Sequence, residues 1–217
     1  MPVLTIASSK GGPGKSTICE LLAGALAGSC KLVALDADPT LAFSRWASET
    51  YEGPAFLTIA ETDEARLAHL IAEQAEQVDL VLVDTAGFGN RAATVAMTSA
   101  DAVLIPALAG EADITEAEKT VRLIEGLARA ARREIPARVL FNRVRRTTLA
   151  RHADGELERA KLVRLKASLS DLVAYGELSY SGKIPTTGTA GTEVAALVVE
   201  LRKLKWIPTP SRNAVKA

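Results

Sequence analysis

The sequence predicts an α/β fold in which helices cover both faces of a twisted, mostly parallel sheet. Short apolar segments bounded by turn residues alternate along the chain with segments of helical period, as in βαβ units. The composition agrees, since 48% of the 217 residues are hydrophobic but only 4% are aromatic, which favours aliphatic helices packed on buried strands. We expect one domain over residues 1–207 and a flexible tail over residues 208–217, where two prolines occur.

Apolar segments are expected to form the strands of this sheet. Most are nearly continuous runs of Val, Leu, Ile and Ala, as in strands that are buried on both faces; the run at 56–59 is weaker. The expected strands lie at 3–7, 32–35, 56–59, 80–83, 102–105 and 137–141.

Segments of helical period follow these strands. They predict helices at 15–27, 41–49, 64–76, 90–99 and 114–132. Asp113 is placed to cap the last of these, with Glu116 three residues on as its capping-box partner. Beyond Asn142 the expected elements are a loop at 143–148, a charged helix at 156–169, a short strand at 173–178 and a final helix at 193–205.

The formal net charge is zero, but its distribution is uneven. Residues 1–120 carry 7 basic and 17 acidic side chains, whereas residues 121–217 carry 19 basic and 9 acidic ones. Such an asymmetry favours a basic face in the C-terminal half that meets an anionic partner. The alternative is that folding interleaves the two halves, so that the charges pair on the surface.

The segment 6–17, IASSKGGPGKST, follows the first expected strand directly and opens the first helix. Its glycines allow successive backbone N–H groups to point at phosphate oxygens, and the helix adds its positive N-terminal end. In this pattern Lys15 reaches the β- and γ-phosphates of a nucleotide, and the Ser16 hydroxyl binds Mg²⁺. The predicted nucleotide-binding residues are Gly11, Gly12, Pro13, Gly14, Lys15, Ser16 and Thr17.

A second lysine, Lys10, precedes this loop. The general pattern G-x-x-x-x-G-K-[ST] requires glycine at position 9, where this chain has serine. The form K-G-G-x-G-K-[ST] resembles the deviant Walker A motif of the ParA/MinD group, and residues 1 to about 142 resemble a small ParA-family partition ATPase. The resemblance implies a P-loop NTPase fold, the cofactors ATP and Mg²⁺, and slow, partner-stimulated hydrolysis. It also implies a homodimer that forms on ATP binding, in which Lys10 acts on the nucleotide of the other subunit, as an arginine finger does.

Three aspartates follow expected strands, at the carboxyl edge where ligands bind in open α/β sheets. Asp36 and Asp38 lie in LVALDADPT, and Asp84 lies in DLVLVDTAG. By the resemblance, Asp38 activates the attacking water and is catalytic together with Lys10 and Lys15, while the metal is held by Ser16, Asp36 and Asp84. The alternative for Asp38 is a helix N-cap with Pro39 as the first helical residue.

The basic C-terminal half is assigned by the resemblance to DNA, because ParA proteins bind DNA non-specifically as ATP-bound dimers. The candidate contacts are Arg143, Arg145, Arg146, Arg202, Lys203 and Lys205. The function implied is plasmid or chromosome partition with a small centromere-binding partner of the ParB or ParG kind, at a cytoplasmic, nucleoid-associated location. Family members also contact adenine with a late segment, which matches residues 181–191 here.

Other functions remain open on the same motif. One is a ParA-like ATPase that positions another cargo, in conjugative transfer or in a protein compartment. Another is a MinD-like ATPase whose terminal amphipathic helix docks on lipid; the residues Val198, Leu201, Leu204 and Ile207 fit the core face of a last helix equally well, and we expect no membrane binding. A ligase with the same loop would need a second substrate pocket.

Overall fold

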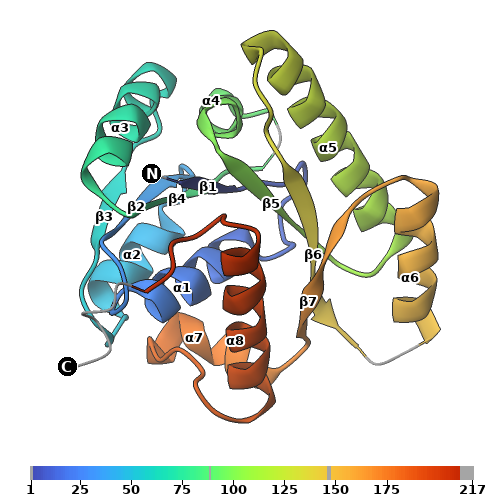
Figure 1. Cartoon of the computed structure of the whole chain (residues 1–217). Coiled ribbons are helices and arrows are strands. Elements are labelled where there is room, and N and C mark those ends of the chain that lie inside the picture. The colour runs from blue at the N-terminus through green and yellow to red at the C-terminus, as the bar shows by residue number, and fades with distance from the viewer. Residues whose placement is uncertain (1, 88, 146–147, 211–217) are drawn as a thin grey trace.

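The computed structural model describes residues 2–87, 89–145 and 148–210. In this part of the chain, seven strands form one sheet with parallel pairings throughout, in the order β3-β2-β4-β1-β5-β6-β7 (Figure 1). The strands are β1 (Val3–Ile6), β2 (Leu32–Ala37), β3 (Leu57–Ala60), β4 (Leu80–Thr85), β5 (Ala102–Ala107), β6 (Ala137–Val144) and β7 (Arg164–Ser170).

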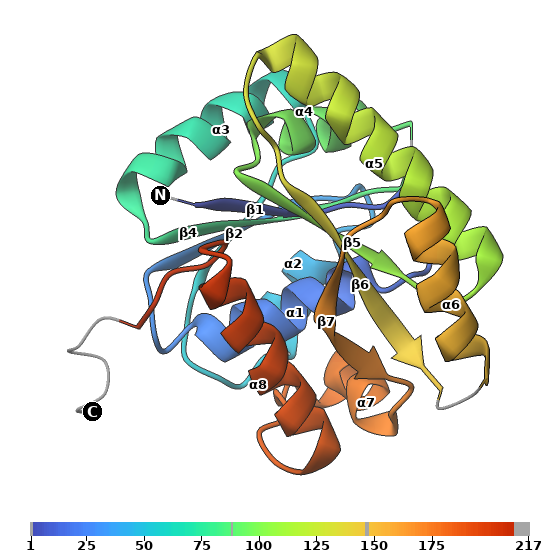
Figure 2. The ribbon, with the colours of Figure 1, turned by 45° about the vertical axis from the view of Figure 1, so that its right-hand side comes forward.

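Helices cover both faces of the sheet, as Figure 2 shows. One face carries α1 (Lys15–Leu26), α2 (Ala42–Glu49), α7 (Val173–Ser181) and α8 (Gly188–Lys203), and the other carries α3 (Glu64–Gln77), α4 (Arg91–Ser99), α5 (Glu111–Ala131) and α6 (Thr148–Arg159). The strands β1, β2, β4 and β5 are buried along their whole length, which explains their continuous apolar sequences. The predicted α/β fold is confirmed.

Two elements of the C-terminal part differ from the sequence prediction. The helix expected at 156–169 is wrong, because α6 ends at Arg159 and β7 follows at Arg164–Ser170. In β7, Leu165 and Leu169 are buried while Lys166 is exposed, so the strand alternates as an edge strand with charged outer positions does. The short strand expected at 173–178 is also wrong, since α7 buries Tyr175 and Leu178 with the three-residue spacing of a helix.

Two helix starts also differ from expectation. The helix α5 begins at Glu111 after Gly110, so Asp113 lies in its first turn and is not the N-cap. The last helix begins at Gly188, five residues before the expected start. The expected loop at 143–148 is shorter on its described side, because β6 extends to Val144. Residues 146–147 of that loop and 211–217 of the expected tail lie outside the described residues.

The helix α8 is fixed against the edge strand β7 by two carboxylates. Glu200 accepts hydrogen bonds from the backbone N–H groups of Lys166 and Ala167, at 2.9 and 2.7 Å. Glu193, two turns earlier, accepts from the N–H of Ser170 at 2.9 Å. Since Glu193 lies at the end of β7 and Glu200 near its start, α8 runs antiparallel to the strands, and its C-terminal end lies at the amino edge of the sheet.

Candidate functional site

The loop between β1 and α1 has the backbone that its glycines predict. Gly12 and Gly14 have φ values of 97° and 95°, in the left-handed region that side chains disfavour. Gly14 also lies against the Asn142 side chain, which a Cβ at this position would overlap. Asn142 donates a hydrogen bond from Nδ2 to the Pro13 carbonyl oxygen at 2.8 Å. The loop is therefore held by β6 as well as by its own helix, with the N-terminal end of α1 directed into it.

Lys15 lies buried at the base of this loop. Its Nζ atom is 3.3 Å from the Lys10 carbonyl oxygen and 3.5 Å from Ser8 Oγ. Burial lowers the pKa of Lys15, while the charges of Asp84 and Asp38 act in the opposite direction. An ammonium held in this way, with few fixed partners, is suited to bind an anion that enters the loop.

Lys10 and Ser9 are held by α5. The hydroxyl of Thr120 accepts from the Ser9 N–H at 3.0 Å, and the Ser9 hydroxyl donates to the carboxylate of Glu116 at 2.7 Å. The Lys10 ammonium is half-exposed and forms an ion pair with Asp113 at 3.6 Å. The serine that replaces the usual glycine therefore connects the loop to α5, and Lys10 pairs within its own chain in this structure.

Asp84 is the penultimate residue of β4, in the centre of the sheet. In register it lies between Ile6 of β1 and Asp36 of β2, and it is fully buried. Among the described residues neither of its carboxylate oxygens has a hydrogen-bond partner of normal geometry. Burial raises the pKa of Asp84 to about 7, although the Ser16 hydroxyl and the Lys15 charge act to lower it. A desolvated, unpartnered carboxylate beside Ser16 has the chemistry of a divalent-cation ligand.

Asp36 and Asp38 differ in their surroundings. Both oxygens of Asp36 accept backbone hydrogen bonds, from the N–H of Asp38 at 3.1 Å and of Ser44 at 2.8 Å. Asp38 is partly exposed, and one of its oxygens accepts from the Thr40 N–H at 2.8 Å. Asp36 thus shapes the turn that presents Asp38 at the carboxyl edge. The capping alternative for Asp38 is wrong, because α2 begins at Ala42 with Leu41 as its N-cap.

A pocket of about 520 Å³ opens beside Thr17. Its walls come from the ends of β6 and β7 and from α7, and they include Asn142, Asp171 and Tyr175. The segment 181–191, which the sequence matched to adenine binding, lies elsewhere, since Ile184 packs on Gly24 two turns further along α1. Asn142 was not predicted as a site residue, although it shares with Asp84 the signal of a polar side chain at the carboxyl end of an apolar strand.

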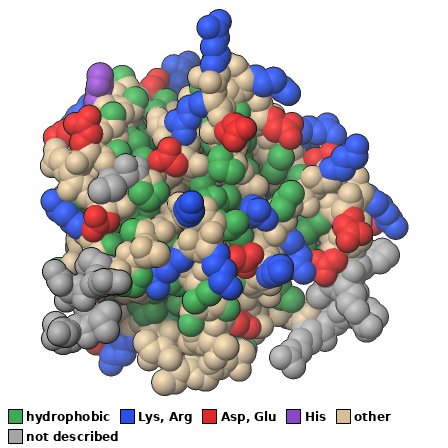
Figure 3. Space-filling view, viewed as in Figure 1, with side chains coloured by type: hydrophobic (Ala, Val, Ile, Leu, Met, Phe, Trp, Pro, Cys, Tyr) green, Lys and Arg blue, Asp and Glu red, His purple; other side chains and the backbone are tan. Residues whose placement is uncertain are grey.

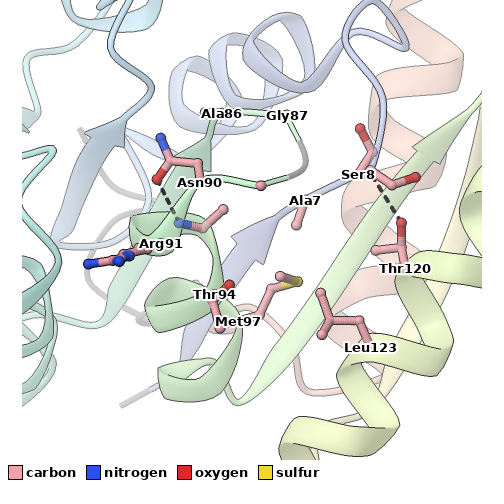
Figure 4. Close-up of a pocket in the computed structure, with 13 residues that line it drawn as sticks. Ala7, Ser8, Ala86, Gly87, Asn90, Arg91, Thr94, Met97, Thr120 and Leu123 are labelled. Carbon is pink, nitrogen blue, oxygen red and sulfur yellow. Dashed lines mark hydrogen bonds between the residues drawn. The ribbon is translucent and has the colours of Figure 1, made fainter.

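A second cavity, of about 170 Å³, lies behind the loop on the other face of the sheet (Figure 4). Ala7, Met97 and Leu123 form part of its apolar wall, and Ala86 and Gly87 lie at its rim. The cavity therefore lies between parts of α4 and α5, next to the segments that begin the phosphate loop and follow Asp84.

The comparisons with known proteins agree with this geometry. The family model described as VirC1 protein matches residues 1–204 of the chain. The chain belongs to the VirC1 family. Protein virC1 of Rhizobium radiobacter is 34% identical over 172 residues, which cover 75% of this chain and 74% of the relative. Protein ParA of the same organism is 32% identical over 145 residues, which cover 66% of this chain and 65% of the relative.

Among solved structures, the ATP complex of McdA from Cyanothece has a TM-score of 0.78 to the VirC1-family chain, over 98% of this chain and 99% of that one, at 16% identity. At this identity the likeness concerns the fold, and it confirms the P-loop NTPase architecture. Together with the ParA and virC1 relatives, it confirms the assignment of the VirC1-family chain to the ParA/MinD group of ATPases.

The basic residues of the VirC1-family chain do not form one surface. Arg143 and Arg145 are exposed at the carboxyl edge, next to Asn142, and Arg145 pairs with Asp171 at 2.7 Å. Arg202, Lys203 and Lys205 lie at the end of α8, at the amino edge. Arg146 lies outside the described residues. We expected the basic residues of the C-terminal half to form one face. The described candidates instead lie at two opposite edges of the sheet, because the chain reverses direction between β6 and α8.

Most apolar side chains of α8 and of the segment that follows it face the core, although Val199 is exposed. Val198, Leu201 and Ile207 are all buried, so the face that a lipid-binding helix would need is already covered. Within the described ranges, the chain contains no helix with the length and hydrophobicity needed to cross a membrane.

Proposed function

We propose that this chain is a nucleotide-switched ATPase that binds ATP and Mg²⁺ at the loop 11–17, dimerises in the ATP state and then holds DNA non-specifically. The observation that carries the proposal is the unpartnered, buried carboxylate of Asp84, set beside the buried ammonium of Lys15 at the start of α1. A buried charge without a partner is costly. A nucleotide with its metal ion would give the Asp84 carboxylate a cation and the Lys15 ammonium an anion as partners.

The residues of the loop have distinct roles in this proposal. The backbone N–H groups of 11–17 and the Lys15 ammonium bind the phosphates, and the Ser16 hydroxyl and the Asp84 carboxylate hold Mg²⁺, which neutralises phosphate charge. Asp38, partly exposed at the same edge, orients a water and accepts its proton. Asp36 was predicted to hold the metal, but both of its oxygens accept backbone N–H groups, so in this proposal it fixes the turn that presents Asp38. The pocket beside Thr17 has room for the purine base.

Dimerisation is the step that Lys10 serves. Its ion pair with Asp113 is half-exposed, and such a pair contributes about 0–1 kcal/mol. Lys10 can therefore leave Asp113 at small cost and reach the nucleotide of a second subunit, as an arginine finger does. Because the loop lies at the carboxyl edge, the two subunits would face each other across that edge.

DNA binding follows from the exposed cations. Arg143 and Arg145 lie at the carboxyl edge, close to the proposed dimer interface, so that dimerisation would bring two such groups together and multiply affinity for one duplex. A small centromere-binding partner of the ParB or ParG kind would stimulate slow hydrolysis and release the dimer from the nucleoid. The cargo in this proposal is a plasmid or chromosome region.

A second candidate differs in the cargo alone. The family model that matches is VirC1, and the virC1 relative is matched at higher identity and over more of the chain than the ParA relative. We therefore keep as the second candidate a positioning ATPase for another cargo, such as a DNA strand in conjugative transfer or a protein compartment. The membrane-associated alternative is not supported, because the apolar face of α8 is buried.

The test uses the full chain with ATP, with ADP and without nucleotide. Light scattering would measure the molar mass, and a gel shift with duplex DNA of random sequence would measure binding. We expect a dimer and a marked gain in DNA affinity with ATP alone, and loss of both in Lys15→Ala. A chain that stays monomeric with ATP and binds no DNA in any state would contradict the proposal.

A further inference from the structure

Two side chains in the wall of the pocket beside Thr17 share one carboxylate as their hydrogen-bond acceptor. Ser170, the last residue of β7, and Tyr175, in the first turn of α7, both line this pocket. Glu193 of α8 accepts from the Ser170 hydroxyl at 2.5 Å and from the Tyr175 hydroxyl at 2.8 Å. It also accepts from the backbone N–H of Ser170 at 2.9 Å. One side chain of α8 therefore holds the end of a strand and the start of a helix in a fixed relation.

Glu193 supports the pocket from outside. Of the described residues that line the pocket, none belongs to α8. The helix lies at the molecular surface, and Figure 3 shows charged side chains of both signs on the face that α8 occupies in Figure 1. A nucleotide in the pocket would thus contact Ser170 and Tyr175 but not Glu193, whose effect on the nucleotide can pass only through these two residues.

The three hydrogen bonds to Glu193 have a charged acceptor, and such bonds are about twice as strong as those between neutral groups. Since β7 is an edge strand, the Ser170 N–H that points to Glu193 has no neighbouring strand with which to pair. The Tyr175 ring is held in the core, but without Glu193 its hydroxyl would keep only the Ala190 carbonyl oxygen, at 3.3 Å. Loss of the carboxylate would therefore loosen the polar part of this wall while the ring stays packed.

A second carboxylate of α8 separates this role from the docking of the helix. Glu200 accepts from the N–H groups of Lys166 and Ala167, at 2.9 and 2.7 Å. Both of these residues lie earlier in β7, and neither of them lines the pocket. Glu193 and Glu200 thus dock the same helix on the same strand, but of the two only Glu193 bonds residues of the pocket wall.

The phosphate half of the site is held by contacts that do not involve α8. The Pro13 carbonyl oxygen accepts from Asn142 of β6, and the Ser9 N–H donates to Thr120 of α5. A change at Glu193 should therefore affect the part of the site that surrounds the base and leave the phosphate loop as it is.

We infer that Glu193 is a positioning residue for the base of the bound nucleotide: it fixes Ser170 and Tyr175 and so shapes the pocket before the nucleotide enters. The inference rests on the proposed function, in which this pocket receives the purine base. A preformed pocket binds more tightly because fewer groups lose their freedom on binding. Affinity for the base thereby depends on the contact between α8 and the end of β7.

The experiment measures the dissociation constants of ATP and of inorganic tripolyphosphate, each with Mg²⁺, by titration calorimetry on the full chain. The test variant is Glu193→Gln, which keeps the shape of the side chain but removes its charge and turns one acceptor into a donor. The matched control is Glu200→Gln, the same change on the same helix. A second test variant, Tyr175→Phe, keeps the ring and removes only the hydroxyl. Thermal unfolding checks that each variant folds.

We expect Glu193→Gln to bind ATP about tenfold more weakly than the parent chain, and Tyr175→Phe about threefold more weakly, because each loses charge-assisted bonds in the pocket wall. Tripolyphosphate should bind both variants as it binds the parent chain, and Glu200→Gln should match the parent chain for both ligands.

Three results would overturn the inference: unchanged ATP affinity in Glu193→Gln, an equal loss in Glu200→Gln, or an equal loss of affinity for tripolyphosphate. The second and third would mean that Glu193 only stabilises the fold. The comparison of Glu193→Gln with Glu200→Gln decides the matter even if tripolyphosphate binds too weakly to measure. A parent chain that binds no ATP would instead contradict the proposed function itself.

Discussion

The Lys10 ammonium lies 3.6 Å from the Asp113 carboxylate of the same chain, with the carboxylate largely covered and the ammonium half-exposed. If Lys10 must reach the nucleotide of a second subunit, the ion pair with Asp113 competes with that contact and favours the monomer. Replacing Asp113 by Asn should therefore favour the ATP dimer by up to about fivefold, the equivalent of up to about 1 kcal/mol for a partly exposed pair. The dimer dissociation constant from light scattering with ATP measures the effect. Lys10→Ala should abolish the dimer, and equal dimer constants for the Asp113 variant and the parent chain would refute the holding role.

Thr120 supports the loop from α5 through its hydroxyl, which accepts from the Ser9 N–H. Thr120→Val keeps the shape but leaves this backbone donor without a partner, and we expect a loss of about 1–2 kcal/mol in the free energy of unfolding. Urea denaturation measures it. The matched control is Thr115→Val on the same helix, whose hydroxyl bonds only its own helix at Glu111. Equal losses in the two variants would show that the contact to Ser9 contributes nothing.

Glu20 gives a prediction for pH. It is buried on α1, and burial, with a smaller contribution from the charge of Asp84, raises its pKa from 4.5 to about 8. The folded chain thus binds more protons than the unfolded chain between these two values, so stability falls as pH rises through this window. Glu20→Gln should leave the free energy of unfolding nearly unchanged at pH 4.5 and raise it by about 4–5 kcal/mol at pH 9.

Denaturation of both proteins at several pH values measures this difference. An exposed carboxylate, Glu73, provides the control as Glu73→Gln, for which we expect a curve parallel to that of the parent chain. A stability gain in Glu20→Gln that does not depend on pH would show that packing, and not ionisation, is the cause.

Two features disfavour a side chain at Gly14: its backbone is left-handed, and the Asn142 side chain occupies the space that a Cβ would need. Gly14→Ala should cost about 1–2 kcal/mol for the backbone alone and more for the overlap with Asn142. The double variant Gly14→Ala/Asn142→Ala removes the overlap but not the backbone strain. We expect a double-mutant cycle to show a coupling of about 1 kcal/mol or more. Additive losses would mean that the loop moves away from β6 without cost.

Asp36 and Asp38 lie two residues apart, but replacing each of them should have a different effect. Asp38→Ala should keep ATP binding and the DNA-bound dimer while hydrolysis falls by at least about 100-fold, as for loss of a general base. Asp36→Ala removes the acceptor of two backbone N–H groups and should lower stability by about 2–3 kcal/mol. Steady-state hydrolysis and thermal unfolding separate the two, and normal hydrolysis by the Asp38 variant would disprove its role.

The sequence predicted the parts of the fold in which one signal dominates. The run at 80–83 is apolar because both faces of the strand are covered, and its carboxyl end predicts that Asp84 lies at the same edge of the sheet as the phosphate loop. Ser16 and Lys15 follow from the same glycine pattern. The backbone of the loop and its position at the carboxyl edge were therefore predictable, while the roles of its residues stay predictions.

The C-terminal part was less predictable because its signals conflict. The edge strand β7 carries Arg164 and Lys166, whose charge resembles a solvated helix face, and its alternation is short. The hydrogen bonds that hold α8 against β7 run from backbone N–H groups of β7 to Glu200 and Glu193. Each of them joins residues more than twenty positions apart. The position of the basic residues depended on the direction of α8, which no local pattern encodes. Asn142 was missed for a related reason, since its partner Pro13 is 129 positions away.

The carboxylates that dock α8 also limit how copies of the chain can assemble. The outer rim of β7 is where a foreign strand would add to enlarge the sheet, but its N–H groups at Lys166, Ala167 and Ser170 are already taken by Glu200 and Glu193. Strand addition there would have to displace two charged acceptors. Growth of fibres by pairing of strand edges is therefore disfavoured at β7, which lowers the tendency of the chain to aggregate through this edge.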